Sequence, residues 1–493
     1  MDRNKNIGDA IITASDSLDS LIPSSEHKYY ILPIIFLRLL YDYIEILKNS
    51  EMSKDNYETV IDKEKIKDVQ SRIFAFFNDN KKETLYGILD AVENCFPDKL
   101  SSVFSTFKFS TNRLGSKEQQ SLALENIVKT FALPPFSFSS FFESKKSLGE
   151  IFKSSIALLA LHSKGDVEYI TPPEISILIS KIVSHSKELK KNRKYYDPAC
   201  GSGSLLSTCA TMEKERGNEV EIFGQEKNGA AWAIAKLNLF LSEADKVTVT
   251  LSDSLRSPPV DNHGNLRKFD VSVSNPPWNM KKWGDDILDT DPFQRFILGA
   301  PKSSADYAFI LHMLAMLNPR GVMATVSPNG LLFRSGGDGL IRRNLVEHNL
   351  IEAIITLPQK LFYNTTIPAN ILLFKKDRKE SDIFFINWNE SEFFSKGVSR
   401  LSPAAIDKIS DLYIHKIELD GISRLVSIAE IRGNEYNLSS NRYIQNESTR
   451  QVVDLISLRK EKHGIELALE EISKRLNQAI IDSDERNKYL NFE

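Results

Sequence analysis

Cysteine is scarce in this chain: the 493 residues include only Cys95, Cys200 and Cys209. No two of them form a Cys-x-x-Cys pair, so the sequence offers no zinc or iron–sulfur motif, and we expect no metal site. A small, odd number of cysteines in a long chain is typical of a reducing compartment. These absences predict a cytoplasmic protein.

The sequence also lacks a hydrophobic run long enough to cross a membrane. Its longest apolar stretch, residues 31–43, is interrupted by Arg38 and Asp42. It is shorter than the roughly 20 residues that span a bilayer, and it therefore predicts a buried helix. The first residues do not show the basic, apolar and small segments of a signal peptide. We expect no membrane partner.

Neither sign of charge is in excess, because 63 Lys and Arg residues face 66 Asp and Glu residues. A protein that grips DNA unaided usually has a basic surplus, since phosphate contacts supply much of the affinity. A balanced charge is compatible with local basic patches or with a partner that helps to hold DNA. It is equally compatible with charge that carries no information about partners. The composition, 41% hydrophobic and 26% charged, predicts a soluble globular protein of two or three domains.

Hydrophobic periodicity divides the chain into three predicted parts. Residues 1–160 have apolar side chains at three- and four-residue steps, which predicts a helical domain. Residues 161–390 alternate short β-branched or aromatic runs with helical stretches, which predicts an α/β domain with a parallel sheet covered on both faces. The predicted strands are residues 194–198, 220–225, 247–251, 271–274, 321–326, 351–357 and 370–374, with 383–388 as a further candidate.

The third predicted part, residues 391–493, begins with an irregular stretch and ends in helix. Between residues 448 and 484, apolar residues recur at alternating four- and three-residue steps and form a short heptad seam. Such a helix packs on its own domain or on a partner subunit, and the sequence leaves both open. The seam consists of Ile465, Leu469, Ile472, Leu476 and Ala479.

A glycine-containing motif follows the first predicted strand and precedes a predicted helix. Its two glycines allow close approach of a ligand to the backbone, and the helix that follows offers free N–H groups. A Gly-x-Gly pair also occurs in dinucleotide-binding loops and plain turns, but the absence of Gly-Lys-Ser/Thr excludes a P-loop. The motif consists of Asp197, Pro198, Ala199, Cys200, Gly201, Ser202, Gly203 and Ser204.

Two acidic residues follow the next two predicted strands. Glu226 ends the second strand, where an acid commonly accepts hydrogen bonds from ribose hydroxyls. Asp253, with Ser254 beside it, follows the third strand; alone, such a pair is equally a helix cap or a turn. Because parallel strands end at the same edge of a sheet, we expect both acids near the glycine motif.

The fourth motif, Asn275-Pro276-Pro277-Trp278, follows the fourth predicted strand. The prolines restrict the backbone and point its carbonyls in a set direction. The Asn275 side-chain oxygen and the Pro276 carbonyl can together accept both hydrogens of an exocyclic amine. Trp278 offers a flat face on which a base taken out of a duplex can stack. Asn-Pro also marks ordinary turns, but a turn does not explain the aromatic residue after it.

In this order, the four features resemble the amino-group methyltransferases of the Rossmann-like, S-adenosylmethionine-dependent class. The tetrapeptide resembles the catalytic motif of N6-adenine DNA methyltransferases, with Trp278 where phenylalanine or tyrosine is more usual. The resemblance implies that Glu226 binds the cofactor's ribose, Asp253 its adenine, and Thr171 its methionine end. The cofactor-binding residues implied are Tyr169, Thr171, Asp197, Pro198, Ala199, Gly201, Ser202, Gly203, Ser204, Glu226, Asp253, Ser254 and Asn275.

A wider resemblance, over nearly the whole chain, is to the methylation subunits of type I restriction–modification systems. It includes residues 30–42 and 110–115, residues 357–368 beyond the catalytic strand, and residues 436–443 before the C-terminal helix. It implies Phe362 as the other wall of the base pocket and duplex DNA as the substrate. It also implies a DNA-specificity subunit held by the C-terminal helices; a second copy of this chain and a restriction (nuclease/translocase) subunit are further candidate partners.

Other functions remain open from the sequence. Asn-Pro-Pro-aromatic also occurs in methyltransferases that act on RNA bases or on protein glutamines, in chains that are usually shorter. A methyltransferase that acts alone is a further alternative. A non-catalytic scaffold is disfavoured by the intact motifs, and a nicotinamide oxidoreductase leaves the Asn275 motif unexplained.

Overall fold

The computed structural model describes residues 3–49, 63–78, 85–107, 116–132, 145–162, 171–186, 191–242, 244–362, 368–389, 392–394, 398–444, 462–476 and 478. The chain divides into two compact units, residues 1–444 and 445–493. This division does not coincide with the boundaries expected at residues 160 and 390. No helix among the described residues is long and apolar enough to cross a membrane.

The N-terminal part is helical, as expected from its periodicity. The helix α2 is buried along most of its length, and Arg38 in it forms an ion pair with Asp42 at 2.8 Å one turn later. This pairing compensates two charges that burial would otherwise disfavour. The helices are α1 (Arg3–Asp16), α2 (Lys28–Asn49), α3 (Lys63–Asn78), α4 (Leu85–Cys95), α5 (Pro97–Leu100), α6 (Lys117–Phe131) and α7 (Lys145–His162), with short turns η1 (Ser24–Glu26) and η3 (Phe104–Thr106).

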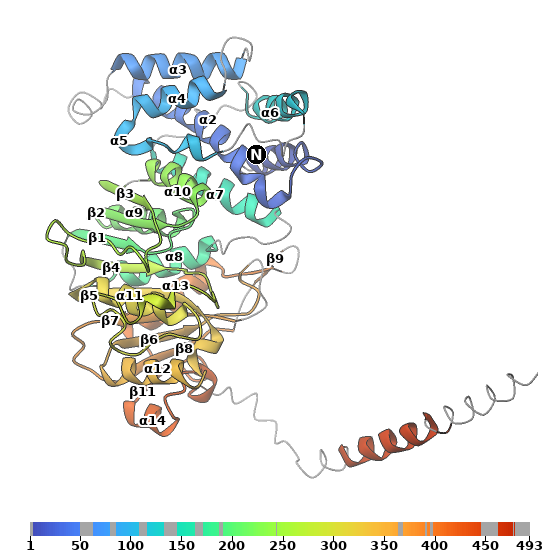
Figure 1. Ribbon diagram of the computed structural model, residues 1–493, viewed down its shortest axis with the longest axis vertical. Helices are drawn as coiled ribbons and strands as arrows, with labels where there is room; N and C mark the ends of the chain where they lie inside the picture. The colour runs from blue at the N-terminus through green and yellow to red at the C-terminus, as the bar shows by residue number, and fades with distance from the viewer. Residues whose placement is uncertain are drawn as a thin grey trace, which may run out of the picture. The chain divides into compact units, whose positions relative to one another are not determined.

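Of these elements, α2, α5, α7 and η3 pack directly onto the helix α10 (Gly229–Phe240) of the α/β part (Figure 1). The ring of Phe240 lies edge-on to Phe96 and to Phe36, with centroids 5.0 and 5.7 Å apart. A Cβ atom on Gly149 of α7 would lie 2.8 Å from the carbonyl oxygen of Leu241, so only glycine allows this approach. Aromatic packing of this kind places the start of α2 close to the loops of the sheet.

The α/β part is built on a nine-stranded sheet in the order β11-β8-β6-β7-β5-β4-β1-β2-β3. All eight predicted strands are present, most within one or two residues of the expected bounds. A separate antiparallel pair is formed by β9 (Glu392–Phe394) and β10 (Val398–Arg400). The sheet strands are β1 (Asn192–Asp197), β2 (Glu219–Glu226), β3 (Lys246–Leu251), β4 (Phe269–Ser274), β5 (Leu317–Pro328), β6 (Ile351–Thr356), β7 (Ala369–Lys375), β8 (Ile383–Asn387) and β11 (Ser423–Val426).

The prediction of an entirely parallel sheet is wrong in two strands. The strand β7 lies between β5 and β6 and runs antiparallel to both, and β11 runs antiparallel to β8. Six of the seven residues of β7 are buried, and residues 371–374 form a continuous apolar run. A buried apolar run does not reveal whether a strand is parallel or antiparallel to its neighbours. Burial on both faces removes the alternation of polar and apolar residues that is typical of antiparallel strands.

Helices cover both faces of the sheet, as predicted. In β6, Ala353 and Ile355 join the apolar cluster that includes α8 and α9, whereas Ile354 joins the cluster that includes α11 and α12. Alternate side chains therefore point into two separate layers. These helices are α8 (Pro173–Ser184), α9 (Ser204–Glu215), α11 (Asp306–Met316) and α12 (Gly337–Glu347).

The expectation that residues 391–440 are irregular is also wrong. Helix α13 (Pro403–His415) packs on α8 and β8, β11 adds an edge strand, and α14 (Ile428–Gly433) follows it. Ser402 caps α13 by accepting a hydrogen bond from the backbone N–H of Ala405. The Ser-Pro start and the apolar Ile406, Ile409 and Leu412 are the local signals that mark this helix.

Candidate active site

The four motifs meet at one edge of the sheet because their strands run parallel (Figure 1). The strand order reverses beside β1, since β2 and β3 lie on one side of it and β4 and β5 on the other. Loops that leave neighbouring strands in opposite directions open a crevice at their carboxyl ends, where such sheets bind ligands. Asp197 ends β1, Glu226 ends β2, and Asn275 follows β4 at this point.

The side chain of Asp197 fastens the first loop to the neighbouring strand. Its Oδ1 accepts hydrogen bonds from the backbone N–H of Ala199 at 2.9 Å and from the Ser274 hydroxyl at 2.7 Å. Burial raises the pKa of the Asp197 carboxyl to about 7, and these two hydrogen bonds offset part of that rise. The carboxyl is thus poised to change charge near neutral pH.

The two glycines of this loop serve different structural purposes. Gly201 and Gly203 both have positive φ, at 54° and 73°. A Cβ on Gly201 would meet nothing within 4 Å, whereas one on Gly203 would approach Leu239 to 3.2 Å. The space beside Gly201 is open to a ligand, and Gly203 allows the first turn of α9 to pack against α10.

Glu226 lies against this loop. Its Oε2 accepts a hydrogen bond from the N–H of Gly201 at 2.9 Å, and its Oε1 accepts one from Asn228 at 2.7 Å. Both bonds hold the carboxylate beside the loop, and carboxylate oxygens have further lone pairs for ribose hydroxyls. Glu226 does not line the cavity described below, so its contact with the cofactor's ribose stays a prediction.

Asp253 is fixed by an ion pair and by a hydrogen bond within its own loop. Its Oδ2 pairs with the exposed Lys227 at 2.7 Å, and its Oδ1 accepts a hydrogen bond from the N–H of Leu255 at 3.2 Å. Ser254 beside it is buried. Neither residue lines the cavity described below, so a contact of Asp253 with the cofactor's adenine stays a prediction.

A chain of buried hydrogen bonds supports the ends of β1 and β2. Arg295 can only donate, so Nδ1 of His312 accepts from it at 3.0 Å and Nε2 carries the proton. That Nε2 lies 2.7 Å from the Tyr196 hydroxyl, which in turn donates to Gln225 at 2.6 Å. Burial holds the pKa of His312 well below its usual value, which keeps this imidazole neutral.

The amide of Asn275 connects the proposed catalytic motif to the segment before α8. Its Nδ2 donates to the Thr171 hydroxyl at 3.2 Å. Thr171 was predicted at the methionine end of the cofactor; Tyr169, predicted with it, lies outside the described residues. Because the amide nitrogen of Asn275 points to Thr171, the amide oxygen points away from Thr171. An acceptor for a substrate amine needs this orientation of the oxygen.

The predicted base-pocket residues contact one another. The rings of Trp278 and Phe362 lie edge to face, with centroids 5.1 Å apart and planes at 63°, and both are buried. Just beyond Trp278, the backbone N–H of Asn279 donates to Asp306 at the start of α11, at 2.8 Å. The sequence analysis did not identify Asp306, because this residue belongs to no motif. Its contact with the catalytic segment is a hydrogen bond from the backbone of a residue far away in the sequence.

A cavity gathers many of the predicted cofactor residues. Its lining combines polar residues, among them Thr171, Asp197 and Asn275, with apolar ones. The unexpected members come from the N-terminal helices: Lys28 and Leu32 of α2, and Ile156 of α7. The lining consists of Lys28, Leu32, Ile156, Thr171, Asp197, Ala199, Cys200, Gly201, Ser202, Ser204, Leu205, Ala231, Ile234 and Asn275.

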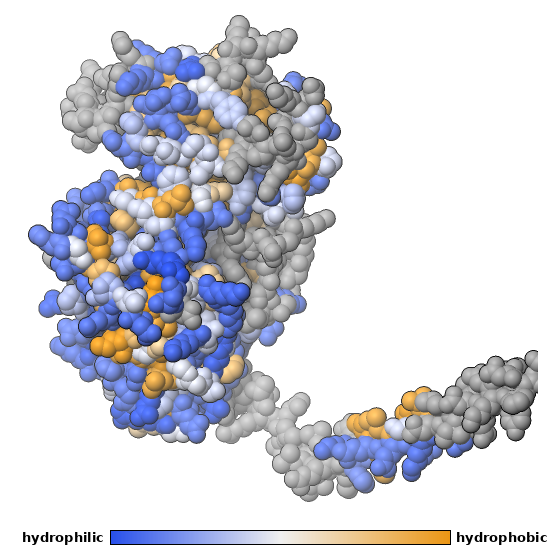
Figure 2. All heavy atoms as spheres, viewed as in Figure 1, coloured by the Kyte–Doolittle hydropathy of each residue, from blue (hydrophilic) through white to orange (hydrophobic). Residues whose placement is uncertain are grey.

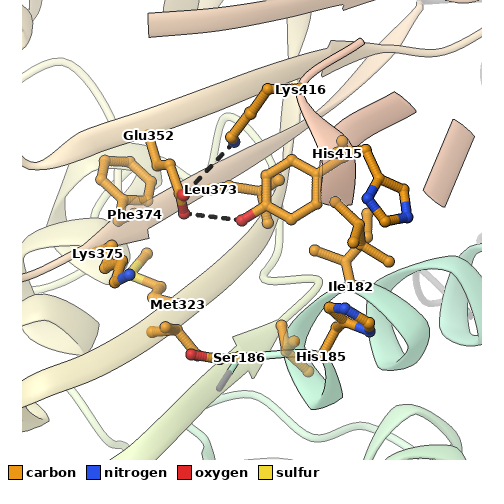
Figure 3. A pocket seen from close by; sticks show the side chains of 14 residues that line it. Ile182, His185, Ser186, Met323, Glu352, Leu373, Phe374, Lys375, His415 and Lys416 are labelled. Atoms are coloured by element: carbon orange, nitrogen blue, oxygen red, sulfur yellow. Dashed lines mark hydrogen bonds and ion pairs between the residues drawn. The ribbon is translucent and has the colours of Figure 1, made fainter. Parts of the chain in front are cut away.

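A second cavity lies between the ends of α8 and α13 and the strands β5, β6 and β7 (Figure 3). Inside it, Glu352 accepts a hydrogen bond from the Tyr413 hydroxyl at 2.7 Å and pairs with Lys416 at 3.5 Å. No residue of the four motifs lines this space, whereas residues of the first and fourth motifs line the first cavity.

Comparison with known proteins identifies relatives over most of the chain. A model of the N-6 DNA Methylase family matches residues 143–452. The methylase subunit of the MjaVII type I restriction enzyme of Methanocaldococcus jannaschii is 32% identical over 348 residues, which cover 67% of this chain and 58% of that subunit. The MpnII methylase subunit of Mycoplasma pneumoniae is 29% identical over 425 residues, covering 83% of this chain and 76% of that one.

A solved structure shares the fold. The type I restriction–modification methyltransferase subunit of Streptococcus thermophilus superimposes with a TM-score of 0.72 and 27% identity. The superposition covers 90% of this chain and all of that one. This likeness includes the helical N-terminal part as well as the sheet, and it agrees with the Rossmann-like fold expected from the motifs.

Proposed function

This chain belongs to the N-6 DNA methylase family, and from that premise we propose that it transfers a methyl group from S-adenosylmethionine to N6 of adenine in duplex DNA. It does so in the cytoplasm as the methylation subunit of a type I restriction–modification complex. One observation carries the proposal: the amide of Asn275 borders the same cavity as the glycine loop and Asp197. A substrate amine at Asn275 is thereby next to a ligand on that loop.

The residues around the cavity fit S-adenosylmethionine. The loop at residues 199–204 offers open space at Gly201, and the Glu226 carboxylate beside it suits ribose hydroxyls. The apolar side chains of Leu205 and Ile234 line the same space. When bound, the cofactor supplies an electrophilic methyl group on a sulfonium sulfur.

The protein's part in the reaction is to hold and polarise the adenine amine. The Asn275 side-chain oxygen and the Pro276 carbonyl accept its two hydrogens, which directs the nitrogen lone pair toward the methyl group. Pro277 keeps these acceptors in place, and Trp278 provides a face for the flipped base. Once the methyl carbon has exchanged its bond to sulfur for a bond to nitrogen, the nitrogen loses a proton to solvent, so no strong base is needed beforehand.

The C-terminal helix supports the proposed subunit role. Within residues 462–476, the seam residues Ile465, Leu469, Ile472 and Leu476 are 57–64% exposed. Figure 2 shows this helix with an apolar strip beside charged residues; Ala479, also predicted in the seam, lies outside the described residues. We propose that the strip packs against helices of a DNA-specificity subunit, in an assembly with a second copy of this chain and a restriction subunit.

The test is methyl transfer from labelled S-adenosylmethionine to duplex DNA, by this chain alone and with a candidate specificity subunit. N6-methyladenine formed only with the partner would support the proposal in full. Activity without the partner would indicate a methyltransferase that reads DNA by itself. Cofactor binding without DNA methylation in either case would reject the DNA substrate and direct the search to RNA or a protein glutamine.

A further inference from the structure

Lys28, the first residue of α2, is 8% exposed and lines the cofactor cavity. A lysine is rarely buried to this extent in a folded protein. Its Nζ lies 5.0 Å from the centroid of the Tyr29 ring, a cation–π distance. The helical N-terminal part thus places a positive charge at a cavity otherwise built by the sheet.

The charges around the cavity are few and opposite. Among the described lining residues, Lys28 is the one cation and Asp197 the one carboxylate. The methionine end of S-adenosylmethionine has a carboxylate, an ammonium group and the sulfonium. Opposite charges attract strongly in a partly buried site. The carboxylate therefore suits Lys28, and the cationic groups suit Asp197 on the loop.

We propose that Lys28 is a cofactor-binding residue that pairs with the carboxylate of S-adenosylmethionine. This inference rests on the proposed function and assigns to the helical part a direct role in the cofactor site. The packing of Phe36, in α2, on Phe240 of α10 holds α2 in the position that this contact needs. Loss of that packing would weaken cofactor binding without any change in the sheet.

The test compares two ligands that differ only in the carboxylate: S-adenosylmethionine and its decarboxylated form. Binding to the full chain is measured by calorimetry, without DNA, for wild type, Lys28→Met and Lys28→Arg. A charge-assisted hydrogen bond corresponds to about ten- to a hundredfold in affinity. We expect wild type to prefer S-adenosylmethionine by about that factor, Lys28→Met to bind both ligands alike, and Lys28→Arg to recover much of the preference.

The two ligands separate a carboxylate contact from a structural role. If Lys28→Met keeps the wild-type preference, Lys28 does not contact the carboxylate and the inference is overturned. If Lys28→Met no longer binds either ligand, Lys28 maintains the shape of the cavity, and the inference is again overturned. If wild type binds neither ligand, the proposed function fails as well, whereas the first two outcomes leave that function intact.

Discussion

The indole of Trp278 meets the ring of Phe362 edge to face, with the ring centroids 5.1 Å apart. A base stacked between two aromatic rings needs them parallel and separated by its own thickness on each side. The observed arrangement leaves no such space, so at least one ring must turn when a base enters. Neither ring lines the cofactor cavity.

This arrangement predicts how substitutions of Trp278 affect activity. Trp278→Ala removes the stacking face and should lower methyl transfer about tenfold to a hundredfold, since base–aromatic stacking is worth about 1–3 kcal/mol. Trp278→Phe keeps a face and should retain most of the rate. Steady-state transfer to duplex DNA, with cofactor affinity as the control, measures both. Equal rates for the alanine and phenylalanine variants would contradict a stacking role.

Asn275→Ala should reduce transfer by at least about a hundredfold, the usual effect of removing one positioned polar group from a reacting centre. Cofactor affinity should change only a few-fold, because the glycine loop and Glu226 are untouched. Thr171→Val is the matched control: it removes the partner of the Asn275 amide nitrogen and leaves the amide oxygen in place. It should therefore cost less than Asn275→Ala. An Asn275→Ala protein with an unchanged rate would refute the mechanism.

The raised pKa of Asp197, about 7, predicts pH-dependent cofactor binding. A cationic ligand favours the ionised carboxylate, so affinity for S-adenosylmethionine should rise between about pH 6 and about pH 8 and then level off. Asp197→Asn should remove the rise. Calorimetry at several pH values tests this, and a flat profile in wild type would contradict it.

The Asp197 carboxyl also makes the stability of the folded protein depend on pH, but in the opposite direction, because its contribution to stability falls as pH rises. Its pKa is higher in the folded than in the unfolded protein, so the folded state binds the proton more tightly. Its contribution is fully present below the unfolded value near 4 and is lost as pH rises through about 7. Denaturant unfolding of wild type and Asp197→Asn should therefore differ in pH dependence across this window.

The exposed seam of residues 462–476 predicts where a partner binds. Leu469→Asp with Ile472→Asp should abolish co-purification with the specificity subunit, because two charges would be buried in an apolar contact. Glu470→Ala, on another face of the same helix, is the control and should bind normally. Cofactor affinity should be unchanged in all variants. Normal complex formation by the double variant would exclude the seam as the docking surface.

Much of the site could be predicted from the sequence because its determinants are local. Glycines that need positive φ, an acid at the end of a strand and the rigid Asn275-Pro276-Pro277 segment can be recognised within a few residues. Their strands could be predicted too, and strands that run parallel bring their carboxyl ends to one edge. The order of the motifs along the chain therefore predicted that they would lie close together.

Other features were decided only by the tertiary structure, because they depend on packing between distant segments. The direction of β7 follows from its place between β5 and β6, which its apolar sequence does not encode. The approach of Lys28 to the cavity depends on aromatic contacts with α10, and the closed pair of Trp278 and Phe362 joins residues more than eighty positions apart. Local sequence determined which groups could react, and long-range packing determined which of them meet.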